Sequence, residues 1–234
     1  MLKRRKKRDG IRVVLLDIDG TLIDSNDAHA RAWVAAGAEL GHDIHFDEVR
    51  PLIGMGGDRV TPMVTGHAED SPDGERVVER RGEIFRERHL PGLLPTRGAR
   101  TLVERMKDEG LEVVIATSAS KADMQALLER IGIRDLIDDR TSSSDADSSK
   151  PAPDIVQAAL ARAGVPPRLA IMVGDTPYDV TAARNAGVDC IALRCGGGWS
   201  DGDFAGALAI YDDPADLLAN WESSPLAREA EPAR

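Results

Sequence analysis

Two aspartates one residue apart follow a short apolar run near the start of the chain. The run Ile11–Leu16 is followed by Asp17 and Asp19, and the next residue, Gly20, permits a turn that could bring both carboxylates to one place. Two like charges at one place cost free energy unless a cation or a shared proton compensates them. A hard divalent cation with oxygen ligands, such as Mg²⁺, would do so. Taken alone, the pair could also be an Asp-rich turn that caps a helix.

A second acidic pair follows another apolar run. The run Ile171–Val173 leads into Asp175, and Asp179 lies in the first turn of a helix that we expect to begin at Pro177. Ligands of open α/β sheets bind beyond the carboxyl ends of the strands, so Asp175 could complete a cation site with Asp17. Asp179 alone could be an ordinary capping residue, because aspartate is favoured at helix N-termini.

Hydroxyl groups and a lysine fall in comparable places. The apolar run Glu112–Ala116 ends in Thr117-Ser118-Ala119-Ser120-Lys121, where hydroxyls and backbone N–H groups at a helix N-terminus could bind an anion. Lys150 stands in a loop just before a helix whose start is marked by prolines. Each feature alone is common, since hydroxyl turns are frequent and a loop lysine is usually solvated.

The elements that must position these residues have the pattern of an α/β protein. Short runs rich in Val, Ile and Leu, without strict alternation, are typical of strands covered on both faces, and helical patterns lie between them. We therefore predict a doubly wound parallel sheet. The expected strands are Ile11–Leu16, Glu112–Ala116, Leu169–Val173, Asp189–Leu193 and a weaker one at Leu136–Arg140, and the clearest amphipathic helices carry Ala99, Leu102, Val103 and Met106, and Met124, Leu127, Leu128 and Ile131.

The stretch 23–93 differs from the rest, because its patterns are helical and it contains no convincing strand. We predict that it forms an inserted helical cap domain, with a glycine-dense loop at Gly54–Arg59 and a return linker at Pro91–Pro95. The α/β core then comprises residues 10–22 and 94–221. Residues 1–9 and 222–234 are expected to be flexible tails.

Composition narrows the class of protein. Of 234 residues, 42% are hydrophobic, which is too many for a disordered chain, and no run reaches the ~20 apolar residues that span a bilayer. Two cysteines cannot form a disulfide framework, so a cytoplasmic location is expected. The net charge of −10 argues against nucleic acid as a partner, and the basic run Lys3–Arg8 is interpreted as a solvated tail.

Taken in order, the four polar segments resemble the motifs of the haloacid dehalogenase (HAD) superfamily, a large set of mostly Mg²⁺-dependent phosphatases and phosphomutases. The insert resembles the helical C1-type cap of its phosphoglycolate phosphatase and β-phosphoglucomutase-like members, over a Rossmann-like core. The matching residues are Asp17-Ile18-Asp19-Gly20-Thr21-Leu22, then Thr117-Ser118, then Lys150-Pro151, then Gly174-Asp175 with Asp179.

The resemblance implies a role for each residue. Asp17 would be the nucleophile that forms an aspartyl-phosphate, and Asp19 the general acid and base. Ser118 would bind a phosphoryl oxygen and Lys150 would bridge the nucleophile and the phosphate. Mg²⁺ would be held by Asp17, the backbone carbonyl of Asp19, Asp175 and Asp179. Thr21 is placed to orient Asp19. The candidate substrate-binding residues are Thr21, Thr117, Ser120, Lys121 and Arg59.

Three functions remain open on the sequence alone. A phosphatase acting on a small phosphorylated metabolite is favoured by Gly174, because the sugar mutases that the chain resembles tend to have glutamate there. A sugar phosphomutase is favoured by Ser120 and Lys121, which resemble the mutase form of the second motif. A non-catalytic phosphate-binding protein is the third possibility. For each of these functions the protein is expected to be a monomer or a homodimer.

Overall fold

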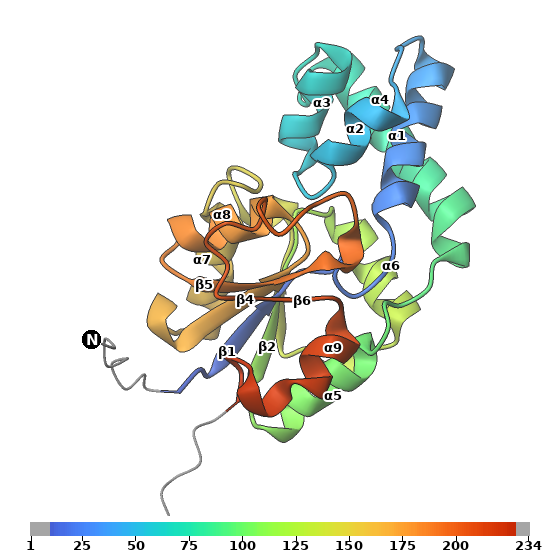
Figure 1. Cartoon of the computed structure of the whole chain (residues 1–234). Helices are drawn as coiled ribbons and strands as arrows, with labels where there is room; N and C mark the ends of the chain where they lie inside the picture. The colour runs from blue at the N-terminus through green and yellow to red at the C-terminus, as the bar shows by residue number, and fades with distance from the viewer. Residues whose placement is uncertain (1–9, 228–234) are drawn as a thin grey trace, which may run out of the picture.

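The computed structural model describes residues 10–227 and has two parts (Figure 1). These are a layered α/β core and a group of helices that lies beyond the carboxyl ends of its central strands. The basic run at 3–8 and the chain ends 1–9 and 228–234 lie outside the described residues. Six parallel strands form the sheet in the order β3-β2-β1-β4-β5-β6. Their bounds are β1 Val13–Leu16, β2 Glu112–Ala116, β3 Asp139–Thr141, β4 Ala170–Gly174, β5 Asp189–Leu193 and β6 Ala209–Tyr211.

The register of the sheet brings the ends of its central strands into line. Leu16, the last residue of β1, pairs with Ile115 of β2 on one side and with Val173 of β4 on the other. The chain runs from β1 outward to β2 and β3 and returns on the other side at β4, so the strand order reverses beside β1. Such switch points are where open α/β sheets bind ligands, and all four polar segments follow strands of this sheet.

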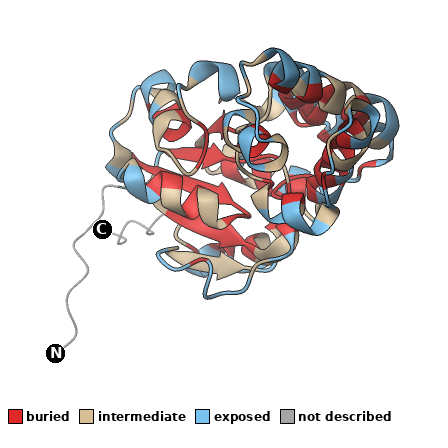
Figure 2. Ribbon diagram, turned by 90° about the horizontal axis from the view of Figure 1, so that it is seen from above, coloured by how far each residue is buried: buried red, intermediate tan, exposed pale blue. Residues whose placement is uncertain are grey.

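Alternation along each strand sends side chains to two separate cores, and Figure 2 shows the strands buried between the helical layers. Val14 and Leu16 pack with α5 (Ala99–Asp108), α6 (Lys121–Ile131) and α9 (Pro214–Ala219). Val13 and Leu15 pack on the opposite face with α7 (Asp154–Ala163) and α8 (Pro177–Asn185). Helices on both faces of a parallel sheet confirm the predicted doubly wound fold.

The segment between β1 and α5 is mainly helical and has a small core of its own. It consists of α1 (Asn26–Leu40), α2 (Phe46–Val49), α3 (Gly57–Thr65), α4 (Pro72–Ile84) and a π-helical turn at Phe85–His89. Its buried apolar residues are Ala30, Trp33, Ile44, Val49, Ile53, Val60 and Val77. Single 3-10 turns complete the chain at Arg50–Leu52, Leu90–Gly92, Arg134–Leu136, Ser143–Asp145, Pro167–Leu169, Arg194–Gly196 and Trp221–Ser223.

Several boundaries differ from the sequence-based expectations. The sixth strand, β6, was not predicted, because three residues with one β-branched side chain give no clear pattern. The charged pattern of Glu75–His89 predicts a helix that begins at Glu75, but α4 begins at Pro72, because Ser71 caps it by accepting a hydrogen bond from Gly74 N (3.1 Å). The C-terminal tail was placed too early at 222, because Leu226 is buried in the main core.

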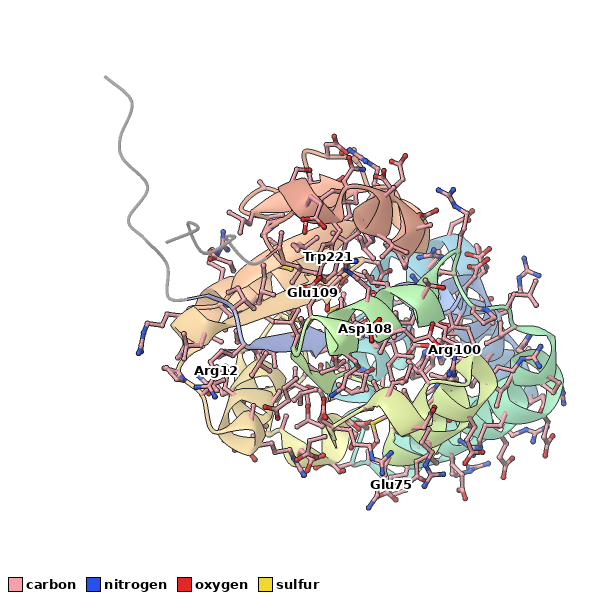
Figure 3. The ribbon with its side chains drawn as sticks, turned by 90° about the horizontal axis from the view of Figure 1, so that it is seen from below. Arg12, Glu75, Arg100, Asp108, Glu109 and Trp221 are labelled. Carbon is pink, nitrogen blue, oxygen red and sulfur yellow. The ribbon has the colours of Figure 1, made fainter. Side chains whose placement is uncertain are left out.

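The C-terminal segment is held against α5 (Figure 3). The guanidinium of Arg105 lies 5.3 Å from the centre of the Trp221 ring and forms an ion pair with Glu109 (2.7 Å). Trp221 itself is buried and belongs to the core cluster on this face of the sheet. Within residues 10–227, the structure contains no helix that is both long and apolar enough to cross a membrane.

Candidate active site

Three buried carboxylates meet at the edge of the sheet that the sequence indicated. Asp17 follows β1, Asp175 follows β4, and Asp179 lies in the first turn of α8. One oxygen from each carboxylate lies within 4.8 Å of the others. The pairing of β1 with β4 causes this convergence, and the N–H of Asp17 continues it by donating to Val173 O (3.0 Å).

Asp175 is enclosed by two glycines and held by two donors. A side chain at Gly20, whose φ is +72°, or at Gly196 would overlap its carboxylate. Thr21 Oγ1 donates to Asp175 Oδ1 (2.9 Å), and Asn26 Nδ2 donates to Asp175 Oδ2 (2.8 Å). Thr21 therefore orients Asp175, not Asp19 as we expected from its proximity in sequence.

Asp179 combines the capping role and the site role that the sequence left as alternatives. Its Oδ2 accepts hydrogen bonds from Thr176 N (3.0 Å) and Thr176 Oγ1 (2.7 Å), which completes a capping box at the start of α8. Its Oδ1 lies 2.7 Å from Lys150 Nζ. This capping box thereby fixes the orientation of the Asp179 carboxylate, whose other oxygen faces Lys150.

Lys150 supplies the positive charge at the centre of this cluster. Its side chain is 1% exposed, and Nζ lies 2.6 Å from Asp17 Oδ1 as well as 2.7 Å from Asp179 Oδ1. Burial alone would lower the pKa of Lys150, but Asp17 and Asp179 outweigh it and hold the pKa above its usual range. The ammonium group therefore stays charged at neutral pH.

One lysine does not balance three carboxylates. Burial raises the pKa of Asp17 to about 7, although Lys150 acts against the shift, and burial together with Asp179 and Asp17 raises the pKa of Asp175 well above its usual range. A divalent cation with oxygen ligands would offset this excess negative charge, so the residues present fit such an ion. The side chain of Asp19 does not belong to this group of three.

Asp19 has partners of its own. Its Oδ1 accepts from Ser25 Oγ (2.5 Å) and lies 2.7 Å from His29 Nε2. Burial would raise the pKa of Asp19, but His29, Ser25 and Arg81 together outweigh it and hold this pKa below its usual range. The His29 ring stacks on Phe85, with 3.9 Å between ring centres. The pair can hold one proton between its two members.

His29 is a functional candidate that the sequence did not indicate, because the five histidines show no metal-ligand spacing and such residues usually have surface or core roles. The position of His29 in the first turn of the helix that follows Asp19 could have indicated that it lies near this carboxylate. His29 follows Asn26 by three residues, which places both on one face of α1. From that face, Asn26 donates a hydrogen bond to Asp175 and His29 forms a hydrogen bond with Asp19.

A cavity of about 60 Å³ lies between the core and the cap. Its core side includes Asp17, Asp19 and the segment Thr117–Ala119, and its cap side combines apolar residues with Arg81. Four predicted substrate-binding residues are not among those that line it, and one of them, Thr21, bonds Asp175 instead. Ser120 caps α6 by accepting from Asp123 N (3.1 Å), Lys121 is exposed, and Arg59 Nε donates to Ser149 O (3.3 Å).

Polar contacts tie the cap to the core around this cavity. The buried carboxylate of Asp123 in α6 forms ion pairs with Arg81 (3.3 Å) and Arg86 (2.7 Å) of the cap. On the opposite side, Tyr178 OH donates to Pro51 O (2.8 Å). The reacting groups are therefore covered by the cap in this conformation.

Comparison with known proteins agrees with this geometry. The family model for haloacid dehalogenase-like hydrolases matches residues 14–193. The chain is 30% identical to phosphoglycolate phosphatase from Rhodospirillum rubrum, with 92% of each chain covered. It is 31% identical to SUPPRESSOR OF QUENCHING 1 of Arabidopsis thaliana over 90% of its own length, but it spans only 20% of that chloroplastic protein.

Among solved structures, a hydrolase from Pseudomonas syringae superimposes with a TM-score of 0.84 at 28% sequence identity. The alignment covers 93% of this chain and all of that one. The extent of the family match and the strand-end carboxylates lead to one assignment. The chain belongs to the haloacid dehalogenase-like hydrolase family.

Proposed function

We propose that the protein is a Mg²⁺-dependent phosphatase that hydrolyses a small phosphorylated metabolite through an aspartyl-phosphate intermediate. The observation that carries this proposal is the buried Lys150, whose Nζ bridges Asp17 and Asp179. The cavity beside Asp17 is also lined by Asp19 and Ser118. A nucleophile, a proton carrier and anion-binding groups thus converge on one small space. The similarity to phosphoglycolate phosphatase supports the same reaction class.

The residues divide the reaction into two steps. An oxygen of Asp17 attacks phosphorus, and the bond from phosphorus to the leaving alcohol oxygen breaks. The proton held between His29 Nε2 and Asp19 Oδ1 passes through the carboxyl group of Asp19 to that leaving oxygen. Water then attacks phosphorus, gives its proton back to Asp19, and releases inorganic phosphate from Asp17.

The remaining groups position the phosphoryl group and balance its charge. The ammonium group of Lys150 and the hydroxyl of Ser118 would bind phosphoryl oxygens, because phosphoryl transfer depends mainly on positioning and charge stabilisation. Mg²⁺ held by Asp17, Asp175, Asp179 and the carbonyl of Asp19 would supply further positive charge. The cap excludes bulk water while the leaving group is present.

Removal of divalent metal should abolish phosphate release. We expect protein treated with EDTA to release no phosphate from a panel of phosphorylated metabolites, and added Mg²⁺ to restore release, because three carboxylates otherwise face the phosphate with one lysine. Colorimetric assay of inorganic phosphate measures both states. Undiminished turnover after chelation would argue against the metal, and no turnover under any condition would favour the non-catalytic alternative.

Replacing His29 by Gln should slow substrates with poor leaving groups most. We expect kcat for an alkyl phosphate to fall roughly 10- to 100-fold, because the proton source beside Asp19 is removed. For p-nitrophenyl phosphate, whose leaving group needs little protonation, the loss should be much smaller. The control is His45→Ala in the same cap, whose side chain is 63% exposed. Equal losses for both substrates would contradict a proton-transfer role.

The sugar phosphomutase alternative has less support. Ser120 and Lys121, which favoured it in the sequence, are a helix cap and an exposed residue outside the cavity lining. A side chain at Gly174 would collide with Asp179, so this backbone position does not accept the glutamate typical of the mutases. An assay that records both products decides the question, since a mutase would isomerise added β-phosphosugar faster than it releases phosphate. The cytoplasmic location stays a prediction from composition, and the choice between monomer and homodimer stays open.

A further inference from the structure

The cap contacts the core at the residue just before the active-site lysine. Ser149 is buried, and the segment Gly56–Arg59, which was expected to be a loop but is the N-cap and first turn of α3, bonds all three of its polar groups. Gly56 N donates to Ser149 Oγ (2.9 Å), Ser149 N donates to Asp58 Oδ2 (3.1 Å), and Arg59 Nε donates to Ser149 O (3.3 Å). Three bonds to one residue fix its backbone as well as its side chain.

The peptide group that joins Ser149 to Lys150 is held at both ends. Its carbonyl oxygen accepts from Arg59 of the cap, and its N–H donates to Ser118 Oγ (3.4 Å), which belongs to the phosphate-binding segment of the core. The orientation of this peptide plane therefore depends on the cap on one side and on the phosphate-binding segment on the other.

We propose that the segment Gly56–Arg59 at the start of α3 positions the catalytic Lys150 by holding Ser149. This inference rests on the function proposed above and assigns new roles to Gly56, Asp58 and Ser149, with Arg59 acting on the carbonyl group of Ser149 rather than on the substrate. Lys150 Nζ must stay within hydrogen-bond reach of two carboxylates and of the phosphoryl group. A shift of about 1 Å in a reacting group can cost on the order of 100-fold in rate.

The contact also requires that position 56 be glycine. A Cβ on Gly56 would lie 2.6 Å from Ser149 Cβ, which is closer than real Cβ atoms approach. It would also lie 2.8 Å from Asp58 Oδ1, but that atom ends a side chain that can turn away, so Ser149 is the main obstacle. The backbone conformation is not the reason, because its φ of −84° and ψ of 174° are open to any residue. Gly56 is thus required by the approach of the cap to Ser149, and a compensating change at 149 should remove that requirement.

A pair of compensating substitutions tests the proposal. Gly56→Ala should lower kcat roughly 10- to 100-fold with KM near the wild-type value, because Ser149 is pushed away and Lys150 is displaced. Ser149→Gly removes the obstructing Cβ at the cost of one hydrogen bond and should reduce kcat far less. The double variant Gly56→Ala/Ser149→Gly should recover to the level of Ser149→Gly alone. Phosphate release under saturating Mg²⁺ measures each variant.

Two controls separate positioning from general damage. Gly92→Ala adds the same methyl group where nothing lies within 4 Å, and should leave kcat unchanged. Arg59→Met should lower kcat and Arg59→Lys should retain more of it, while Arg76→Met, an exposed cap arginine, should have no effect. A double variant as slow as Gly56→Ala, with an unchanged melting temperature, would overturn the proposal.

A readout without turnover distinguishes failure of this inference from failure of the proposed function. Reductive methylation followed by peptide mass spectrometry reports how accessible each lysine amine is. Lys150 should be protected in the wild-type protein and in the double variant, and modified faster in Gly56→Ala, with the partly exposed Lys107 as the internal reference. Equal protection of Lys150 in all variants would refute the positioning role even if the enzyme is an active phosphatase.

Discussion

Replacing Asp17 by Asn should lower kcat for phosphate release by at least about 10⁴-fold, the scale seen when a catalytic nucleophile is removed. Asparagine has the shape of aspartate but lacks the negative charge that attacks phosphorus. The folded protein should not suffer, because one of three mutually repelling buried carboxylates is neutralised. Initial-rate measurement of phosphate release, together with a melting temperature equal to or above that of the wild type, checks both statements.

Asp19→Asn is the matched control for this experiment. It removes the same charge two positions along the chain, from the proton carrier rather than the nucleophile. With p-nitrophenyl phosphate, Asp19→Asn should still become phosphorylated and then turn over slowly, and intact-protein mass spectrometry should detect the covalent phosphate. Asp17→Asn should never show it. A kcat for Asp17→Asn within tenfold of the wild type would rule out Asp17 as the nucleophile.

Substitution of Gly196 by Ala should raise the Mg²⁺ concentration needed for half-maximal activity roughly 10- to 100-fold, as loss of the groups that orient metal ligands commonly does. The added Cβ would overlap the carboxylate of Asp175 and force it away from Asp17 and Asp179. Gly196 O also accepts a hydrogen bond from Asn26 Nδ2 (3.1 Å), so displacement of this loop disturbs a second partner of Asp175.

Metal binding in this variant can be followed without turnover. Mg²⁺ that binds only the folded state raises its melting temperature, so the rise produced by a fixed Mg²⁺ concentration should be smaller in Gly196→Ala than in the wild type. Gly202→Ala, in the same C-terminal region, is the control, because the nearest heavy atom to its added methyl group would be 3.7 Å away. An unchanged Mg²⁺ requirement in Gly196→Ala would show that Asp175 is not a ligand.

Much of the fold was predictable because parallel strands buried on both faces leave a strong local pattern. The continuous apolar runs at 112–116 and 189–193 correspond to β2 and β5 without change of bounds. Strand β6 and the packing of Leu226 were missed, since short edge strands and single buried residues near a chain end carry little periodic signal. Tertiary contacts, not local propensity, define these elements.

The sequence by itself determined which chemistry-bearing residues follow which strands, and in a parallel sheet this is enough to bring Asp17 and Asp175 to one edge. It could not determine the partners of each group. The tertiary structure decided that Thr21 bonds Asp175, that His29 serves Asp19, and that Arg59 holds Ser149. The first contact depends on the pairing of β1 with β4, and the other two depend on how the inserted cap packs on the core, which the local sequence pattern does not encode.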